Sequence, residues 1–341
     1  MKKTLILCTC ILLVTVLCLG FVQMLVTPKY MTDTLDGALI GEYYREKTPH
    51  DVVFIGDCEV YECFTPPTLW QEYGITSYVR GSAQQLIWQS YYLMEETLKR
   101  ENPKAVVFNV LSIKYGEPQN EAYNRMTLDG MKWSGSKLRS IYASKTEEES
   151  VISYVFPLLR YHSRWNDLTK EDWKYLFHRD TVSHNGYLMQ TGVKPKTSNI
   201  PGRPLVDYTL PEIGFEYLEK MRLLCEENGT ELILIKAPTN DWKYHWYDEW
   251  DAQITAWANK KGVDYYNFIP LADEIGLDWS TDTYDGGVHL NVFGAEKLTS
   301  YFGKILAEKY GISDRRGDVG LDTVWADKVA VYQKERNGES Q

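Results

Sequence analysis

The stretch Asp51-Val-Val-Phe-Ile-Gly56-Asp57-Cys58-Glu59 contains a short apolar run that ends in glycine and leads directly into polar residues. Such a run is typical of a β-strand that is buried on both faces. Similar runs recur along the chain, and amphipathic patterns typical of helices lie between them. The strand-like runs cover residues 51–56, 76–80, 105–110, 231–236 and 263–268, and the helical patterns cover 84–100, 210–228, 248–260 and 292–309. This alternation predicts an α/β fold, a three-layer α/β/α domain around a parallel five-stranded sheet.

The first residues indicate the compartment. Met1-Lys2-Lys3 precedes an uncharged run from Thr4 to Thr27, which is long enough to cross about 30 Å of hydrocarbon as a helix. The two lysines before the run favour an N-terminus on the inside. A cleaved signal peptide is the alternative, but the run lacks the small-residue pattern of a cleavage site. We therefore expect one transmembrane helix, a signal anchor in the cell membrane, with the C-terminal domain extracytoplasmic.

The strand and helix alternation is interrupted between the third and fourth strand-like runs. Residues 112–210 are rich in aromatic residues and contain an amphipathic pattern over 147–165. We interpret them as an insertion that lies on the C-terminal edge of the sheet. The predicted organisation is a transmembrane helix at 1–27, a juxtamembrane linker at 28–50, the α/β domain at 51–310 and a polar C-terminal tail at 311–341.

Charge and composition exclude one class of partner and indicate another. Lys and Arg number 37 against 47 Asp and Glu, so the net charge is 37 − 47 = −10. No basic cluster follows the first few residues, so nucleic-acid binding is not expected. The 25 Tyr and 11 Trp exceed what a core needs, and aromatic rings can stack on sugar rings. The segment that follows the fourth strand-like run contains four candidates for substrate binding. The alternative is that this segment forms a packed aromatic cap. The four candidates are Trp242, Tyr244, His245 and Trp246.

Two reactive groups stand at predicted strand ends, where parallel sheets bind their ligands. Cys58 follows the first strand, and a helix N-terminus at that place is expected to lower the pKa of its thiol. His289 follows the last strand, in the loop Asp282-Thr-Tyr-Asp285-Gly-Gly-Val-His289. Together they form a candidate nucleophile and base, with Asp285 or its rival Asp282 as the carboxylate that orients the imidazole. Taken alone, each has a structural alternative: a buried apolar cysteine and a surface histidine.

The spacing of the cysteines, histidines and carboxylates does not by itself identify a disulfide or a metal site. A disulfide between Cys58 and Cys63, or a thiol redox sensor built on them, is a further alternative. No spacing signature indicates a metal site, and no cofactor is expected.

Two blocks of the sequence resemble the first and last blocks of the SGNH (GDSL) hydrolase superfamily. They are Val53-Phe-Ile-Gly-Asp-Cys58-Glu-Val-Tyr and Asp285-Gly-Gly-Val-His289-Leu-Asn-Val-Phe-Gly-Ala-Glu-Lys297. The pattern is most similar to membrane-anchored envelope members, the D-alanyl lipoteichoic acid transfer proteins and the alginate-type O-acetyltransferases. The resemblance implies a flavodoxin-like domain with Cys58 as nucleophile and His289 as base, oriented by a nearby Asp. It also implies an oxyanion site made by Cys58, Gly81 and Asn109.

The chain departs from the family pattern at three points. Cys58 stands where the family has serine, Asp285 lies four residues before His289 instead of three, and the Gly-x-Asn-Asp block is absent. The expected function is that of an acyl-esterase or O-acyltransferase acting on a cell-envelope polysaccharide or glycolipid. Because a single anchor cannot export acyl groups, a separate membrane acyl-donor protein is the expected partner. The alternative is a catalytically silent relative that binds glycans or scaffolds an envelope assembly complex.

Overall fold

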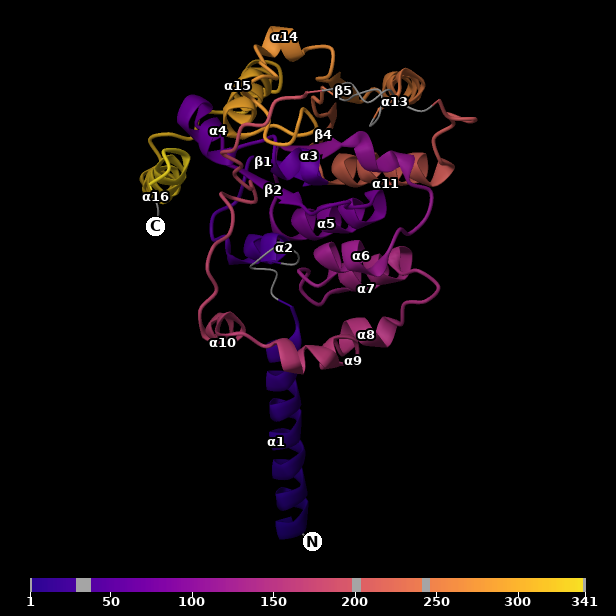
Figure 1. Cartoon of the computed structure of the whole chain (residues 1–341), viewed down its shortest axis with the longest axis vertical. Coiled ribbons are helices and arrows are strands. Elements are labelled where there is room, and N and C mark those ends of the chain that lie inside the picture. Colours follow the sequence, from indigo (N-terminus) through magenta and orange to yellow (C-terminus); the bar gives the residue numbers. More distant parts are fainter. Residues whose placement is uncertain (1, 29–37, 198–203, 241–245, 340–341) are drawn as a thin grey trace.

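One parallel sheet of five strands forms the centre of the domain, in the order β2-β1-β3-β4-β5 (Figure 1). The strands are β1 (Val52–Gly56), β2 (Ser77–Gly81), β3 (Ala105–Asn109), β4 (Glu231–Lys236) and β5 (Asp264–Asn267). The computed structural model describes residues 2–28, 38–197, 204–240 and 246–339. This strand order is that of flavodoxin-like folds. The predicted fold class is therefore confirmed.

Alternate side chains of β1 enter two different cores. Val52 and Phe54 pack under one helical layer, whereas Val53 and Ile55 pack under the other, and all four are fully buried. This double burial is the physical reason for the continuous apolar run at 51–56. The first layer consists of α4 (Pro66–Tyr73) and α15 (Val292–Glu308), and the second of α5 (Ile87–Arg100), α11 (Glu212–Asn228) and α13 (Asp248–Lys261).

Short elements connect the strands and helices. Helix α5 begins three residues later than its predicted start because Gln84 has a φ of 50°, which lies outside the helical region. The short elements of the domain are α2 (Ala38–Glu42), η1 (Tyr43–Arg45), α3 (Cys58–Tyr61), η2 (Val110–Lys114) and α14 (Ala272–Ile275).

The insertion occupies a different place from the one predicted. Its first helices, α6 (Glu121–Leu128) and α7 (Gly135–Ser144), pack on the outer side of α5, and Thr127 of α6 also contacts Ser82, which follows β2. The amphipathic pattern over 147–165 is not one helix, because Pro157 interrupts it. The resulting pieces and the following helix are α8 (Val151–Val155), α9 (Leu158–Tyr161), η3 (His162–Asp167) and α10 (Lys170–Phe177).

The end of the insertion lies at the carboxyl ends of the strands. The backbone N–H of Leu188 donates to the Tyr61 carbonyl at 2.7 Å, and that of Val292 donates to the Gln190 carbonyl at 2.7 Å. These contacts hold the last part of the insertion against α3 and against the start of α15. This stretch therefore lies on the C-terminal edge, as the sequence predicts.

The polar C-terminal tail contains a helix that the sequence analysis did not predict, α16 (Val319–Arg336). Its Trp325 ring stacks on Trp70 of α4, with ring centroids 5.3 Å apart. Leu321, Trp325 and Tyr332 are buried, while most other side chains of the helix are exposed. The apolar residues of this helix are distributed all around it, so they form no recognisable amphipathic stripe, although Leu321, Trp325 and Tyr332 suffice to dock the helix.

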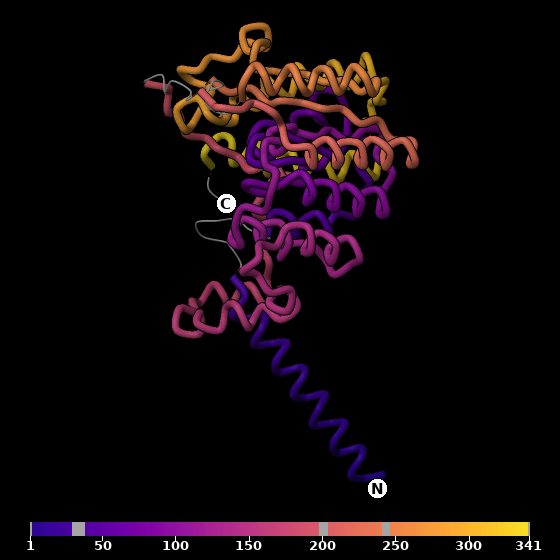
Figure 2. The backbone as a smooth tube through the Cα atoms, turned by 90° about the vertical axis from the view of Figure 1, so that its right-hand side faces the viewer, coloured from indigo at the N-terminus to yellow at the C-terminus, as the bar shows by residue number. Residues whose placement is uncertain are grey.

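Helix α1 (Lys2–Val26) projects away from the domain (Figures 1 and 2). It is long and apolar enough to cross a membrane, with a mean hydropathy of 2.9, and its apolar side chains are exposed. Only Leu25 and Val26, at its end, are buried. A signal anchor and a signal peptide both predict such a helix.

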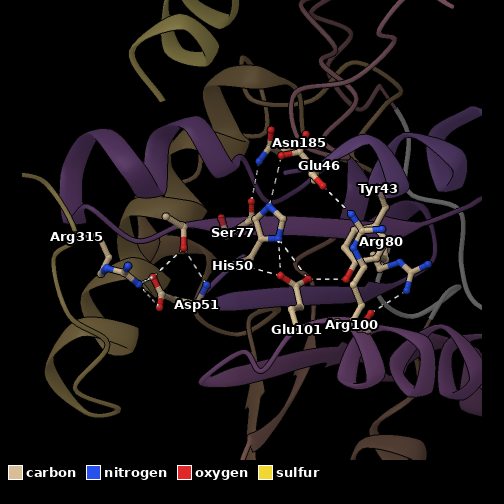
Figure 3. Close-up of polar contacts among 12 residues, drawn as sticks. Tyr43, Glu46, His50, Asp51, Ser77, Arg80, Arg100, Glu101, Asn185 and Arg315 are labelled. Carbon is tan, nitrogen blue, oxygen red and sulfur yellow. Dashed lines mark hydrogen bonds and ion pairs between the residues drawn. The ribbon is translucent and has the colours of Figure 1, made fainter. Parts of the chain in front are cut away.

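A buried ion pair lies at the opposite end of β1 from Cys58 (Figure 3). His50 Nδ1 lies 3.0 Å from Glu101 Oε2, the His50 backbone N–H donates to the same oxygen, and Nε2 lies 3.7 Å from Glu46 Oε2. Burial opposes the charge on His50, but the Glu101 and Glu46 carboxylates raise its pKa above the ordinary value. This pair ties the segment before β1 to the end of α5.

We expect His50→Gln to lower the free energy of unfolding by about 3 kcal/mol near pH 6, because the change removes the charged partner of the buried Glu101 carboxylate. Since the folded pKa of His50 exceeds the unfolded value of about 6.5, the stabilisation is complete below that pH. It is lost as the pH rises through the folded pKa, so the difference between wild type and variant should shrink in alkaline buffer. Urea unfolding of the full chain in detergent measures this. The exposed His178, changed to Gln, is the control without effect, and a pH-independent difference would contradict the assignment.

Candidate active site

Cys58 stands at the turn between β1 and α3. The strand ends at Gly56, and Asp57 caps the short helix by accepting the backbone N–H of Glu59 at 3.1 Å. The turn is tight at Gly56, where an added Cβ would lie 2.5 Å from the Val60 side chain. Cys58 is the first residue of α3, so its own N–H has no acceptor within the helix. Its side chain is half-buried.

His289 is held by a loop that folds back on itself before α15. Gly286 and Gly287 have φ values of 91° and 97°, which favour glycine. The turn lets Asp285 Oδ1 accept the backbone N–H groups of Val288 at 3.2 Å and His289 at 2.9 Å. The carboxylate thereby fixes the backbone beside the ring that it also contacts.

The imidazole of His289 bridges the sulfur and the carboxylate. His289 Nε2 lies 3.1 Å from Cys58 Sγ, and His289 Nδ1 lies 2.6 Å from Asp285 Oδ2. In the tautomer that donates Nδ1–H to Asp285, Nε2 accepts the thiol proton. Two groups that stand 231 positions apart in the chain thus meet at one edge of the sheet.

Asp282, the rival orienting residue, makes a different set of contacts. Its Oδ2 lies 2.7 Å from Lys297 Nζ and accepts the backbone N–H of Asp278 at 2.8 Å. It is buried and anchors the loop to α15. Of the two carboxylates, Asp285 is the one in contact with His289.

Two residues near the imidazole were not predicted, Glu62 and Tyr284. Glu62 Oε2 lies 3.6 Å from His289 Nδ1 and accepts the Tyr284 hydroxyl at 3.0 Å. The Tyr284 ring lies parallel to the imidazole, with centroids 6.2 Å apart. Burial raises the pKa of Glu62 to about 7. Its spacing of four residues from Cys58 places both on one side of α3, which is the signal that could have identified it.

The electrostatics of the sulfur differ from the sequence expectation. Burial raises the pKa of the Cys58 thiol to about 11, although His289 acts in the opposite direction, so the expected lowering is wrong. Burial disfavours the charged imidazole, but Cys58 and Asp285 raise the pKa of His289 well above its ordinary value. The sulfur therefore keeps its proton at neutral pH unless the basic imidazole takes it.

Beneath Cys58 lies a buried polar network that the sequence analysis also missed. Lys236 Nζ lies 2.8 Å from both carboxylate oxygens of Glu59 and donates to the Ala237 carbonyl. The Asn109 amide nitrogen donates to Asp57 Oδ1 at 3.1 Å and to Glu59 Oε2 at 3.0 Å. Both amide protons of Asn109 are thus used, so its predicted role as an oxyanion donor is wrong. Its observed role is to hold the two carboxylates that flank Cys58.

Gly81 lies at the end of β2 and pairs with Gly56 of β1. An added Cβ there would lie 3.0 Å from the Gly56 carbonyl oxygen and 3.3 Å from that of Asp57. The backbone of Gly81 therefore lies close to the Cys58 turn, where a side chain would make tight contacts.

The structure describes one of the four candidate substrate-binding residues. Trp242, Tyr244 and His245 lie outside the described residues. Trp246 is only 1% exposed and packs in the core against Trp250, with its indole nitrogen donating to Asp251 Oδ1. A ring that is buried in this way cannot stack on a sugar, so its predicted role is wrong and the alternative of a packed aromatic residue holds for it.

The remaining cysteines and carboxylates form neither a disulfide nor a metal site among the residues that the structure describes. Cys58 and Cys63 are both free thiols, and Cys63 is buried. Within the described ranges, no cluster of three or more His, Cys, Asp or Glu side chains is arranged to hold a metal ion.

No family model matches the chain, and no curated protein matches its sequence. Among solved structures, it is similar to a protein assigned to the G-D-S-L lipolytic family from Desulfitobacterium hafniense, with 13% identity over 75% of this chain and 98% of that chain and a TM-score of 0.38. A protein described as an acylhydrolase from Bacteroides fragilis has 12% identity over 79% of this chain and 95% of its own, with a TM-score of 0.39. A GDSL-like lipase from Bacteroides thetaiotaomicron has 13% identity over 79% and 94%, with a TM-score of 0.38. These similarities concern the fold alone.

Proposed function

We propose that this chain is an SGNH-type acyl-esterase or O-acyltransferase, anchored in the cell membrane by α1 and facing outward. Cys58, His289 and Asp285 are its catalytic triad. The observation that carries the proposal is the continuous contact from Cys58 Sγ through the His289 imidazole to Asp285 Oδ2, over distances of 3.1 and 2.6 Å. The first and last blocks of the sequence, which resemble that superfamily, supply these residues.

The proposed reaction is acyl transfer in two halves. Cys58 Sγ attacks the ester carbonyl while its proton moves to His289 Nε2. The carbon–oxygen bond of the ester then breaks, the alcohol leaves with the proton from His289, and the acyl group remains on sulfur as a thioester. In the second half His289 takes a proton from water or from an acceptor hydroxyl, which attacks the thioester and restores the thiol.

The oxyanion that forms in each half needs hydrogen-bond donors. The backbone N–H of Cys58 is a donor without an acceptor inside α3, and Gly81, whose backbone packs against the Cys58 turn, is the second proposed donor. One such donor is worth about 3 kcal/mol of barrier. Asn109 has no part in this proposal, since its amide is bound to Asp57 and Glu59.

The proposed substrate class is a cell-envelope polysaccharide or glycolipid. An exposed apolar helix long enough to span a membrane, joined directly to the domain, supports a site close to the cell surface. The same reasoning supports a membrane protein as the acyl donor, because a single helix provides no route for an acyl group across the bilayer. Hydrolysis and transfer differ only in whether water or a hydroxyl attacks the thioester.

An acyl-enzyme on Cys58 is the expected direct product. Incubation of the full chain with an activated acetyl ester, followed by acid quenching and peptide mass spectrometry, should place one acetyl group on the peptide that carries Cys58. Cys58→Ala should remove the adduct, whereas the buried Cys63 should stay unmodified in both proteins. If several activated esters leave Cys58 unmodified and glycan binding survives Cys58→Ala, the silent glycan-binding alternative replaces the enzyme.

A further inference from the structure

Several large apolar side chains are exposed on the part of the insertion that lies beside α1. We call them the apolar collar: Ile152, Phe156, Leu159, Trp165, Trp173 and Phe177. Phe177 is 82% exposed and Trp165 is 62% exposed. Large apolar side chains that are exposed together on one segment are typical of contact with a membrane or another protein. The collar elements, α8 to α10, lie where α1 leaves the domain (Figures 1 and 2).

Direct contacts join the collar elements to the end of α1. The Trp173 and Phe21 rings have centroids 6.3 Å apart, and Arg164 Nη1 donates to the Val26 carbonyl at 2.9 Å. Leu25 and Val26 are buried at this junction. The last turn of α1 is therefore part of the folded domain, which supports a retained anchor over a cleaved signal peptide.

The position of Phe21 along α1 sets the depth of Trp173. A helix needs about 20 residues to cross 30 Å of hydrocarbon, and 20 residues counted from Thr4 end at Gln23. Phe21 therefore lies just inside the apolar span, and the Trp173 ring that contacts it lies at the boundary between hydrocarbon and headgroups. Tryptophan is enriched at that boundary because its ring is apolar and its N–H is polar.

The charge of the surrounding segment indicates how it would bind lipid. Residues 145–180 contain six basic and seven acidic residues, so they carry almost no net charge. The driving force for membrane binding is thus the burial of the apolar side chains, and attraction to anionic headgroups contributes little. A zwitterionic lipid should be sufficient.

We propose that the apolar collar lies in the interface of the bilayer that α1 spans and holds the domain against the membrane in one orientation. This rests on the part of the proposed function that makes α1 a membrane anchor, and it does not depend on the chemistry at Cys58. In that orientation β2 is the strand nearest the bilayer and β5 the farthest from it (Figure 1). The Cys58 site is then presented at a constant height above the lipid surface.

Photocrosslinking of the full chain in phosphatidylcholine vesicles tests the proposal. Phe156 and Phe177 are replaced singly by p-benzoylphenylalanine, a mild change at two exposed phenylalanines. Leu17 in α1 serves as the membrane-embedded control, and Phe293, exposed on α15 at the far side of the domain, as the aqueous control. Because interfacial side chains reach about 5–10 Å into the headgroup boundary, both collar positions should capture ~10-fold more phospholipid than position 293.

The controls separate the ways in which the proposal can fail. In one outcome, position 17 captures lipid while positions 156 and 177 capture no more than position 293. That result overturns the collar and leaves the anchor in place. Capture at 156 or 177 of a second copy of the chain, instead of lipid, overturns it as well. Absence of lipid capture at all positions, 17 included, overturns the anchor together with the collar. Ester turnover, measured separately on the same variants, reports on the catalytic proposal alone.

Discussion

Cys58→Ala and His289→Ala are each expected to lower the turnover of an acetyl ester by roughly 10⁴- to 10⁶-fold. Alanine at position 58 removes the atom that would carry the acyl group. Alanine at position 289 leaves the thiol without an acceptor for its proton, and burial raises the pKa of that thiol to about 11. The two residues act on one proton transfer, so the double variant should be no slower than either single variant.

Cys63→Ala is the matched control for this pair of variants. Cys63 lies five residues beyond Cys58, is free and buried, and packs in the core beneath α4 and α15. Its replacement should lower stability slightly and leave kcat/KM at the wild-type value. The measurement is hydrolysis of a chromogenic acetyl ester by the full chain in detergent. Wild-type turnover in either Cys58→Ala or His289→Ala would remove the catalytic assignment.

Asp285→Asn is expected to lower kcat by roughly 10³- to 10⁴-fold while leaving the fold intact. The carboxylate holds His289 Nδ1 at 2.6 Å and also accepts the backbone N–H groups of Val288 and His289. An amide can keep part of this geometry but not the charge that stabilises the imidazolium. The pKa of Asp285 itself lies below its ordinary value, because the contact with His289 outweighs burial.

The pH profile gives this prediction a second readout. Cys58 and Asp285 raise the pKa of His289 even though burial opposes the charge, and catalysis requires the unprotonated imidazole. The acidic limb of kcat/KM should therefore lie above the ordinary histidine value of about 6.5. Loss of the Asp285 charge lowers the pKa of His289, so the limb should move to lower pH in Asp285→Asn.

Asp282→Asn is the variant that distinguishes a carboxylate that orients His289 from one that only stabilises the fold. Asp282 is buried and pairs with Lys297 at 2.7 Å, so its replacement should lower the unfolding midpoint. Turnover by the folded fraction should stay near the wild-type value, with an unshifted pH profile. A larger loss of kcat in Asp282→Asn than in Asp285→Asn would reverse the assignment of the orienting carboxylate.

Much of the fold could be predicted because a strand that is buried on both faces must consist mainly of apolar residues. Val53 and Ile55 face one helical layer while Val52 and Phe54 face the other, so every position of β1 must be apolar. The same double burial made β2, β3 and β4 recognisable. Helix α16 was not predicted because its apolar residues are distributed around the helix and do not gather on one face.

Part of the candidate site could likewise be predicted from the sequence, and part could not. Cys58 was predictable because it closely follows β1, and His289 because it lies in the loop before α15, downstream of the last strand. Parallel strands bring their carboxyl ends to one edge of the sheet. The choice between Asp285 and Asp282 was not predictable, because both lie in one loop within reach of His289 along the chain. Glycine turns at Gly286 and Gly287 aim one carboxylate at the imidazole, while Lys297 on α15 holds the other.

Asn109 and Trp246 show why side-chain roles need the assembled structure. Asn109 ends a strand at the catalytic edge, yet its amide is bound to carboxylates from the neighbouring turn. Trp246 follows β4 in an aromatic stretch, yet its ring is buried against α13. In both cases the partner comes from a segment that is distant in the sequence, so no local pattern records it.

Residue type and short-range spacing are enough to predict the succession of strands and helices along the chain, the apolar N-terminal helix, and Cys58 and His289 as a candidate pair. The folded structure is needed to see which aspartate contacts His289, whether the sulfur is acidic, and where the insertion lies. These depend on burial and on contacts between distant segments. A pKa or a hydrogen-bond partner is a property of the surroundings that folding creates.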